Sequence, residues 1–194
     1  MNIEEAKKIL GREFGFTVDF ANMILQDLKL SKDAKILDIG TGIGNLAIML
    51  ALNGYKVVTG EPEEDDSTYA KQDWLVNAKK VNVSHLIEFK HFDAKDTPFE
   101  GNTFDAIFFL GSLHHIEKED HEKVLKECTR ISKSNGVICI FEPNAKGIKL
   151  IKNFNASHPD AADPSEYAKD FNLSLRKIEG DFFDAFTFGG KWNK

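Results

Sequence analysis

Short apolar runs alternate with helical patterns along most of this chain, and that alternation restricts the possible folds more than any other feature. Strand-like runs are expected at residues 34–39, 56–59, 86–90, 104–110 and 137–141. The run FDAIFFL at residues 104–110 is almost wholly apolar, as is typical of a strand that is buried on both faces. Strands that alternate with helices indicate a mostly parallel sheet with helices on both sides.

The end of the chain departs from this alternation. Residues 173–178 and 182–188 are both strand-like, and only the turn Glu179-Gly180-Asp181 separates them. Because so short a connection has no room for a crossover helix, these strands should pair antiparallel at one edge of the sheet. The sequence therefore predicts an α/β fold, a Rossmann-like, seven-stranded and mostly parallel sheet with an antiparallel C-terminal hairpin.

Helices are expected where apolar residues recur at helical spacing. The predicted segments are residues 1–10, 19–30, 45–52, 68–80, 120–131 and 147–154. A further short helix should begin at Asp163-Pro164-Ser165-Glu166, which has an N-cap residue, a proline at the first helical position and a glutamate at the third. The 194 residues suit one domain.

Composition excludes several classes of protein. The chain is 42% hydrophobic with a net charge of −6, and its basic residues are dispersed, which disfavours a broad nucleic-acid surface. No apolar run approaches the roughly 20 residues of a membrane span, and residues 1–10 lack a signal core, so we expect a cytoplasmic protein without a membrane partner. Cys128 and Cys139 lie in apolar patterns and should be buried.

Three alternating glycines directly follow the first strand, in the stretch ILDIGTGIGN at residues 36–45. In an open parallel sheet this position faces the ligand crevice. The dinucleotide fingerprint G-x-G-x-x-G would need a glycine where Asn45 stands. Asp38, two positions before Gly40, is unsuited to pyrophosphate but suits a cationic amine. These features favour S-adenosylmethionine, which carries an amino group and a sulfonium but no phosphate.

Acidic residues also follow the next two strands. Glu61 comes just after the second strand, where a carboxylate can accept hydrogen bonds from both hydroxyls of a ribose. Asp93 ends the third strand, where its carboxylate would accept from an adenine amino group. Both positions belong to the ligand-binding edge of the predicted sheet.

Taken together, these residues resemble the class I S-adenosylmethionine-dependent methyltransferases, and most closely the branch of the ubiquinone and menaquinone biosynthesis methyltransferases. The resemblance extends from about residue 34 to the end. It rests on the order and spacing of these motifs: ILDIGTGIG (36–44), VVTGE (57–61), FDAKDTPFEGNTFDAIFF (92–109), LGSLHHI (110–116) and SKSNGVICIFEP (132–143).

The resemblance implies a role for each matching position. The methionine moiety would lie at Asp38, Gly40, Thr41 and Gly42, the ribose at Glu61, and the adenine at Asp93 and the Ala94 backbone; Leu110 and Gly111 would lie near the sulfonium. It also implies one methyltransferase domain over residues 1–194: N-terminal helices that cover the site (1–30), a cofactor-binding core (31–143), and a C-terminal helix and hairpin (144–194). S-adenosylhomocysteine would be the product.

The acidic run at residues 61–66 is a departure from the family pattern. Glu63 stands where relatives usually have Ser, and two or three residues are added before the next helix. How this loop closes over the cofactor is therefore an open point.

A pair of histidines offers a general base. His114 and His115 follow the fourth strand, at the pocket edge that would face the transferred methyl group. Each could instead pack beneath the next helix. His121 and Glu122 are nearby in sequence, but their spacing matches no familiar ligand set, so no metal site is predicted.

The acceptor does not follow from the sequence. Residues 13–16, the loop after Ser112 and residues 142–163 should build its pocket, which a second copy of the chain could complete as a homodimer. A small-molecule acceptor is favoured. The alternatives are a tRNA or protein methyltransferase, a non-catalytic S-adenosylmethionine-binding regulator and, more distantly, an NAD-dependent oxidoreductase.

Overall fold

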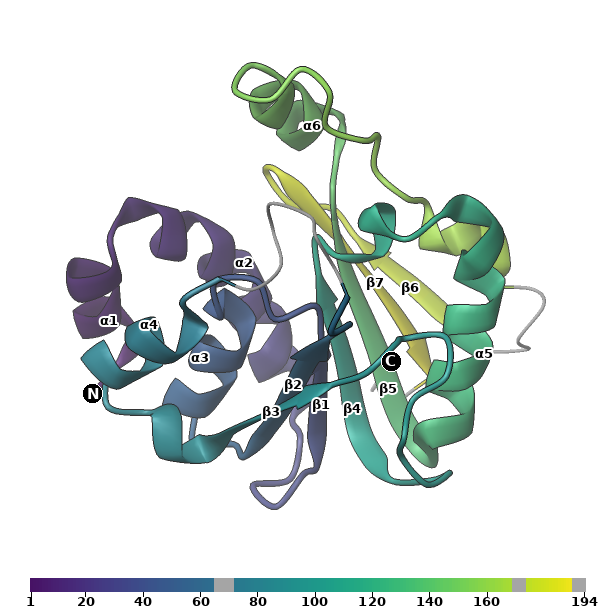
Figure 1. Ribbon diagram of the computed structural model, residues 1–194, viewed down its shortest axis with the longest axis horizontal. Coiled ribbons are helices and arrows are strands. Elements are labelled where there is room, and N and C mark those ends of the chain that lie inside the picture. Colours follow the sequence, from purple (N-terminus) through teal and green to yellow (C-terminus); the bar gives the residue numbers. More distant parts are fainter. Residues whose placement is uncertain (65–71, 169–173, 190–194) are drawn as a thin grey trace.

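The computed structural model describes residues 1–64, 72–168 and 174–189, which form a seven-stranded sheet between two layers of helices (Figure 1). The strand order is β3-β2-β1-β4-β5-β7-β6. The strands are β1 Ile36–Ile39, β2 Val57–Glu61, β3 Ile87–His91, β4 Phe104–Leu110, β5 Ser132–Pro143, β6 Leu175–Ile178 and β7 Phe183–Gly189. This is a doubly wound sheet whose direction switches between β1 and β4.

Pairing in the sheet follows the sequence prediction. The strands β1 to β5 are parallel, whereas β7 pairs antiparallel with both β5 and β6. β6 therefore forms the outer edge, and β7 is inserted between it and β5. The predicted fold class and its antiparallel hairpin are confirmed, although residue 173 of the predicted sixth strand lies outside the described residues.

Helices cover the two faces unequally. On one face lie α1 Ile3–Leu10, α2 Arg12–Leu28, α3 Asn45–Leu52 and α4 Trp74–Lys80, and on the other lies α5 His121–Ile131 (Figure 1). α6 Ala145–Lys152 lies beyond the carboxyl end of β5. The short 3-10 segments are η1 Ser84–Leu86, η2 Leu113–His115, η3 Lys118–Asp120 and η4 Pro164–Tyr167. The predicted N-cap at Asp163 is present, since its side chain accepts from the Ser165 backbone.

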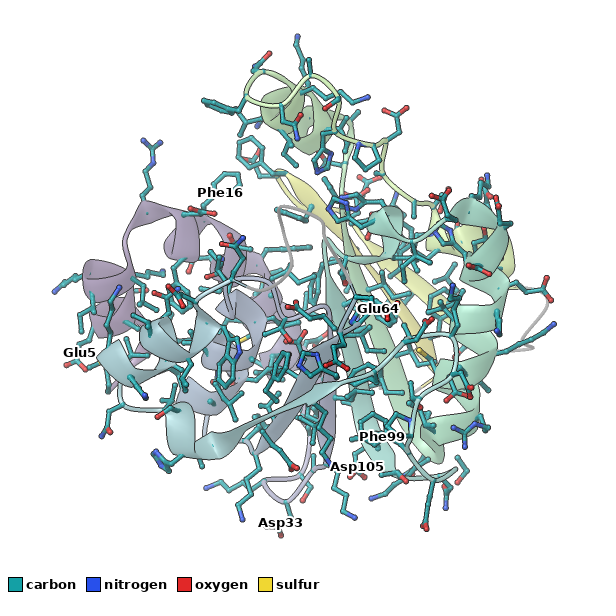
Figure 2. All side chains as sticks on the ribbon, in the orientation of Figure 1. Glu5, Phe16, Asp33, Glu64, Phe99 and Asp105 are labelled. Atoms are coloured by element: carbon teal, nitrogen blue, oxygen red, sulfur yellow. The ribbon has the colours of Figure 1, made fainter. Side chains whose placement is uncertain are left out.

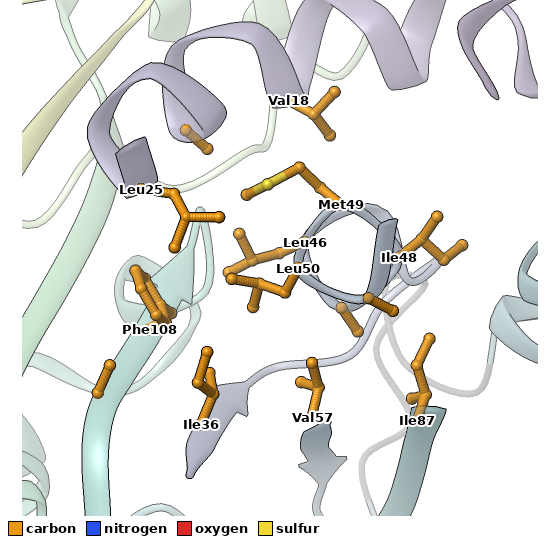
Figure 3. Packing of buried hydrophobic residues seen from close by; sticks show 14 of the residues in the cluster. Val18, Leu25, Ile36, Leu46, Ile48, Met49, Leu50, Val57, Ile87 and Phe108 are labelled. Atoms are coloured by element: carbon orange, nitrogen blue, oxygen red, sulfur yellow. The ribbon is translucent and has the colours of Figure 1, made fainter. Parts of the chain in front are cut away.

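The larger hydrophobic core lies beneath α2 and α3 (Figure 3). Met49 of α3 lies between α3 and α2, near Val18 and Leu25, while Ile36 and Val57 rise from the sheet below. α3 is apolar on every side because it is enclosed by α2 and the sheet together. This packing fixes the start of α3, and with it the glycine turn that precedes the helix.

The N-terminal region differs from the prediction. Residues 13–16, which fell between the two predicted N-terminal helices, belong to α2, which begins at Arg12 rather than at residue 19. Gly15 is accommodated inside this helix because the Lys7 stem of α1 packs 3.4 Å from the place where a Cβ would stand. Lys7 also forms ion pairs with Asp19 and Glu4. Contact between α1 and α2 thus outweighs the low helix propensity of glycine.

Two further elements have different bounds. β5 begins at Ser132 rather than residue 137, because Ser132 pairs with Phe104 before a register shift in the ladder. The helix predicted over residues 68–80 is described only from Trp74, since residues 65–71 lie outside the described part of the chain. Cys128 and Cys139 are buried, as predicted. Within the described residues, no helix is long and apolar enough to cross a membrane.

Candidate functional site

A pocket of about 810 Å³ opens at the carboxyl ends of the parallel strands. Its walls come from the segments that follow β1, β2, β3, β4 and β5, together with the first turns of α2. This is the crevice where doubly wound sheets bind their ligands. Of the predicted site residues, all except Asp38 line it: Gly40, Thr41, Gly42, Glu61, Asp93, Ala94, Leu110, Gly111, His114 and His115.

The glycine turn requires glycine at three positions. Gly40, Gly42 and Gly44 have φ values of 93°, 49° and 85°, in the left-handed region that residues with a Cβ rarely adopt. A Cβ on Gly40 would also lie 2.5 Å from the Ser112 Cβ. The turn therefore brings bare backbone to the pocket wall and leads directly into the N-terminus of α3.

Asp38 lies behind this wall rather than in it. Its carboxyl is 1% exposed, and its Oδ2 accepts a 2.8 Å hydrogen bond from the Thr59 hydroxyl. Oδ1 is buried and has no hydrogen-bond partner among the described residues. Burial raises the pKa of Asp38 to about 8, the nearby Glu61 charge adds to this, and the Thr59 hydrogen bond opposes it. A carboxyl with one unpaired buried oxygen is chemically suited to a cationic ligand group.

Glu61 links the glycine turn to β2. It is the last residue of β2 and is 6% exposed, and its Oε2 accepts a 3.3 Å hydrogen bond from the Gly42 backbone N–H. Its acceptor-only carboxylate is therefore fixed on the pocket wall between the two segments. That position fits the two hydroxyl donors of a ribose.

Asp93 and Ala94 form the wall beyond β3. The Asp93 Oδ1 accepts a 2.9 Å hydrogen bond from the Lys95 backbone, so it caps its own turn. The Lys95 ammonium lies 3.7 Å from the Asp93 Oδ2 and 2.8 Å from Asp120. Ala94 is buried at the same wall. About half of the Asp93 side chain is exposed, and its Oδ2 faces the Lys95 ammonium.

At the opposite end of the pocket, the two predicted histidines belong to η2. His114 Nδ1 lies 2.7 Å from Glu142 Oε2, and these side chains are only 3% and 1% exposed. His114 Nε2 and Glu142 Oε1 are buried without a hydrogen-bond partner in the described structure. His115 is exposed, and its ring centre lies 4.2 Å from that of His114.

Two residues of the segment 142–163, which was expected to help build the acceptor pocket, were not singled out from the sequence. His158, from the loop after α6, places its ring centre 5.1 Å from that of His114 and 5.2 Å from that of His115. Burial lowers the pKa of His158. Glu142 could have been found, because it is an acid at the end of a strand like Glu61 and Asp93. His158 has no comparable signal, since it stands alone in a loop.

The nearby His121 does not join this cluster. Its Nε2 donates to the carbonyls of Leu113 and Ile116, at 3.1 and 2.9 Å, and so fixes the end of η2. Residues 13–16 contribute differently than expected: Glu13 lines the pocket, Phe14 is buried in the core, and Phe16 projects from the start of α2 (Figure 2). The Phe16 ring packs 4.5 Å from that of Phe182, before β7. Asp65 and Asp66 of the acidic run lie outside the described residues.

Known methyltransferases are among the proteins that this chain is similar to, and three of them serve as examples. A demethylmenaquinone methyltransferase of Staphylococcus aureus is 26% identical over 168 residues, covering 87% of this chain and 67% of the relative. A sterol 4-C-methyltransferase of Caenorhabditis elegans is 32% identical over 123 residues, which are 61% of this chain but only 34% of that protein. The crystal structure of a SAM-dependent methyltransferase from Aquifex aeolicus has a TM-score of 0.65 at 19% identity, covering 97% and 98% of the two chains.

The family model described as "Methyltransferase domain" matches residues 37–140, which is more than half of the chain and includes the glycine turn, Glu61, Asp93 and the histidine pair. The alternative of an NAD-dependent oxidoreductase is thereby set aside. The chain belongs to the methyltransferase domain family and is a class I S-adenosylmethionine-dependent methyltransferase.

Proposed function

We propose that this methyltransferase transfers the methyl group to a small molecule that is held against the histidine cluster, which consists of His114, His115 and His158. The observation that carries the proposal is that His114, paired with the buried Glu142, lines the same pocket as the apolar residues Leu110, Ile151 and Phe183. An apolar recess with a few polar groups is typical of small-molecule sites. The net charge of −6 weighs against tRNA as the acceptor.

The cofactor residues are assigned from the wall described above. The glycine turn, residues 40–42, would hold the methionine moiety, Glu61 the ribose, and Asp93 with the Ala94 backbone the adenine. Asp38, behind the wall, would act on the cationic amine through its unpaired Oδ1. Leu110 and Gly111 then lie between the cofactor end and the histidines. When bound, S-adenosylmethionine supplies the sulfonium methyl carbon.

Methyl transfer requires the nucleophile to be aligned behind the methyl carbon and, for an O–H or enol acceptor, to lose a proton. His114 is the better placed base, because Glu142 orients its ring through Nδ1 and leaves Nε2 without a hydrogen-bond partner among the described residues. His115 is the second candidate. One of these imidazoles would take the proton as the acceptor's electron pair bonds to the methyl carbon, and sulfur would keep the electron pair of the broken carbon–sulfur bond.

Three segments of the chain contribute different parts of the pocket. Residues 1–30 cover the pocket through Glu13 and Thr17, residues 31–143 carry the cofactor wall, and residues 144–194 supply Ile151, His158 and Phe183. A homodimer that closes the acceptor side stays a prediction.

An acceptor screen with labelled methyl donor tests the proposed function. The relatives' names suggest quinols and sterols as first compounds, alongside phenols, with bulk tRNA and protein as competing classes. Transfer to a small molecule, with a rate that falls at least tenfold in His114→Ala or Glu142→Gln, is expected. Labelling of tRNA or protein alone would contradict the proposal, and binding of cofactor without transfer to any class would favour a regulator.

Calorimetry with S-adenosylmethionine and S-adenosylhomocysteine tests the cofactor assignments. Glu61→Ala should weaken binding by roughly 1–3 kcal/mol, since it removes a charged acceptor for the ribose hydroxyls. Glu88→Ala, which removes an exposed acid near the start of β3, is the matched control and should bind as the wild type does. Equal affinities in all three proteins would place the ribose elsewhere.

A further inference from the structure

The three imidazole rings of His114, His115 and His158 meet at one point although they come from two segments of the chain. His114 and His115 lie in η2 after β4, whereas His158 lies in the loop after α6. One ring nitrogen from each residue lies within 4.8 Å of the other two. We propose that these three histidines bind a divalent transition-metal ion, Zn²⁺ by preference, in the acceptor half of the pocket.

Hydrogen bonds orient two of the three rings as metal ligands. His114 Nδ1 lies 2.7 Å from Glu142 Oε2, and His158 Nδ1 lies 2.9 Å from the Pro159 carbonyl. A carboxylate and a carbonyl only accept, so Nδ1 carries the proton in both rings and Nε2 carries the lone pair. This is the arrangement of metal-binding histidines, whose second nitrogen donates to a carboxylate or a backbone carbonyl.

A second observation points independently to a ligand. His114 Nε2 is buried and has no hydrogen-bond partner in the described parts of the chain. An unsatisfied buried nitrogen is costly, and a cation at the centre of the cluster would satisfy it. Glu142 is itself held in place, because the Ala162 backbone donates to its Oε2 at 3.2 Å.

The geometry matches an open metal site. Three nitrogens bound to tetrahedral Zn²⁺ at about 2.0–2.1 Å lie about 3.3 Å apart, so the cluster must contract from its present spread. Rotation of the exposed His115 ring can shorten its distances to the other two rings. Three protein ligands leave a fourth position vacant, as in catalytic rather than structural zinc sites. A ligand set made only of imidazoles favours Zn²⁺, Co²⁺ or Ni²⁺ over Mg²⁺ or Ca²⁺.

The role of the metal rests on the proposed function, whereas its binding does not. The oxygen of a hydroxyl or enol acceptor would take the fourth position and release its proton to water more readily. An oxygen electron pair then forms the bond to the methyl carbon, the carbon–sulfur bond breaks, and sulfur keeps that electron pair. The metal stays divalent throughout, and the cluster becomes an anchor for the acceptor instead of a direct base.

Metal binding is tested on the full-length protein after treatment with a chelator and dialysis. Titration with Zn²⁺ against a coloured competitor should give one equivalent per chain, and Co²⁺ should give the visible spectrum of a four-coordinate site. His158→Ala and His114→Ala should each weaken Zn²⁺ binding at least 100-fold. Glu142→Gln should weaken it by 10–100-fold, because it removes the carboxylate that orients His114.

His85→Ala is the matched control. It removes an exposed imidazole next to β3 at the amino end of the strand, away from the pocket, and should leave the stoichiometry and affinity unchanged. Binding of S-adenosylmethionine by His158→Ala, with wild-type affinity, shows that this variant is folded; His158→Gln replaces it if it is not.

Less than a tenth of an equivalent of Zn²⁺, or wild-type affinity in His158→Ala, overturns the metal site. The proposed function has a separate readout: if the chelated enzyme still methylates a small molecule at the full rate, the catalytic role of the metal fails, while the metal site and the proposed function stand. One equivalent of Zn²⁺ that is lost in His158→Ala upholds the site even if no acceptor is found.

Discussion

Replacing Asp38 with Asn should change how the stability of the fold depends on pH. The carboxyl of Asp38 is 1% exposed, and one of its oxygens has no hydrogen-bond partner among the described residues. Asn has nearly the same shape, and its Oδ1 can still accept the hydrogen bond from the Thr59 hydroxyl. The substitution therefore removes the ionisation of this side chain and little else.

The magnitude follows from the pKa. Burial raises the pKa of Asp38 from 3.8 to about 8, so the folded protein keeps a proton that the unfolded chain releases above pH 4. The folded state binds more protons across this range, and its stability falls as the pH rises toward 8. At about 1.4 kcal/mol per pH unit, the three units between pH 5 and pH 8 amount to at most about 4 kcal/mol.

Urea unfolding of wild type and Asp38→Asn at pH 5, 6, 7, 8 and 9 measures this difference. The free energy of unfolding of the variant, relative to that of the wild type, should rise by a few kcal/mol between pH 5 and pH 8 and should not rise further above pH 9. Asp33→Asn, which changes an exposed carboxyl, is the control and should follow the wild-type curve. Parallel curves for wild type and Asp38→Asn would mean that Asp38 is charged in the folded protein at neutral pH.

Three shorter predictions concern the rest of the fold. Hydrogen bonds from Arg130 lower the pKa of Glu127 to about 2, so Glu127→Gln should lower the free energy of unfolding by about 2 kcal/mol at pH 7. This difference should disappear as the pH falls from 4.5 to 2, and urea unfolding at both ends of that range would measure it. Gly60→Ala would place a Cβ 2.0 Å from a β3 carbonyl oxygen and should destabilise by about 1–3 kcal/mol; an unchanged melting temperature would contradict this. Cys128 and Cys139 are buried with raised pKa values, so a thiol reagent should modify them only in denaturant, and rapid labelling of the native protein would refute their burial.

Much of the fold was predictable because the sequence carries local signals for it. The strand Phe104–Leu110 and the helix Asn45–Leu52 have the predicted bounds, since an apolar run and an enclosed helix are each marked by their own residues. The start of α2 was not predictable in this way. It depends on Lys7 of α1, which covers the missing Cβ of Gly15, and such a contact between two helices leaves no periodic pattern.

The residues of the candidate site also differ in how far the sequence predicts them. Gly40, Glu61 and Asp93 each follow a strand of the parallel sheet, so topology alone brings them to one pocket. His158 reaches the same pocket through an irregular loop, and its position depends on how α6 leaves the end of β5. Closeness in sequence is likewise a poor guide to this cluster. His121 is close in sequence but turns away to hydrogen-bond backbone carbonyls.

The loop that carries His158 has a consequence for how this enzyme could be altered. The wall assigned to the cofactor is complete by Ser112, whereas Ile151 and His158 belong to one stretch between β5 and η4. This stretch can be exchanged for another of similar length without cutting a strand of the sheet or the core beneath α3. Under the proposed function, the part of the acceptor side that this stretch supplies is open to grafting, whereas Leu110, His114 and Phe183 stay with the sheet and the methyl donor stays the same.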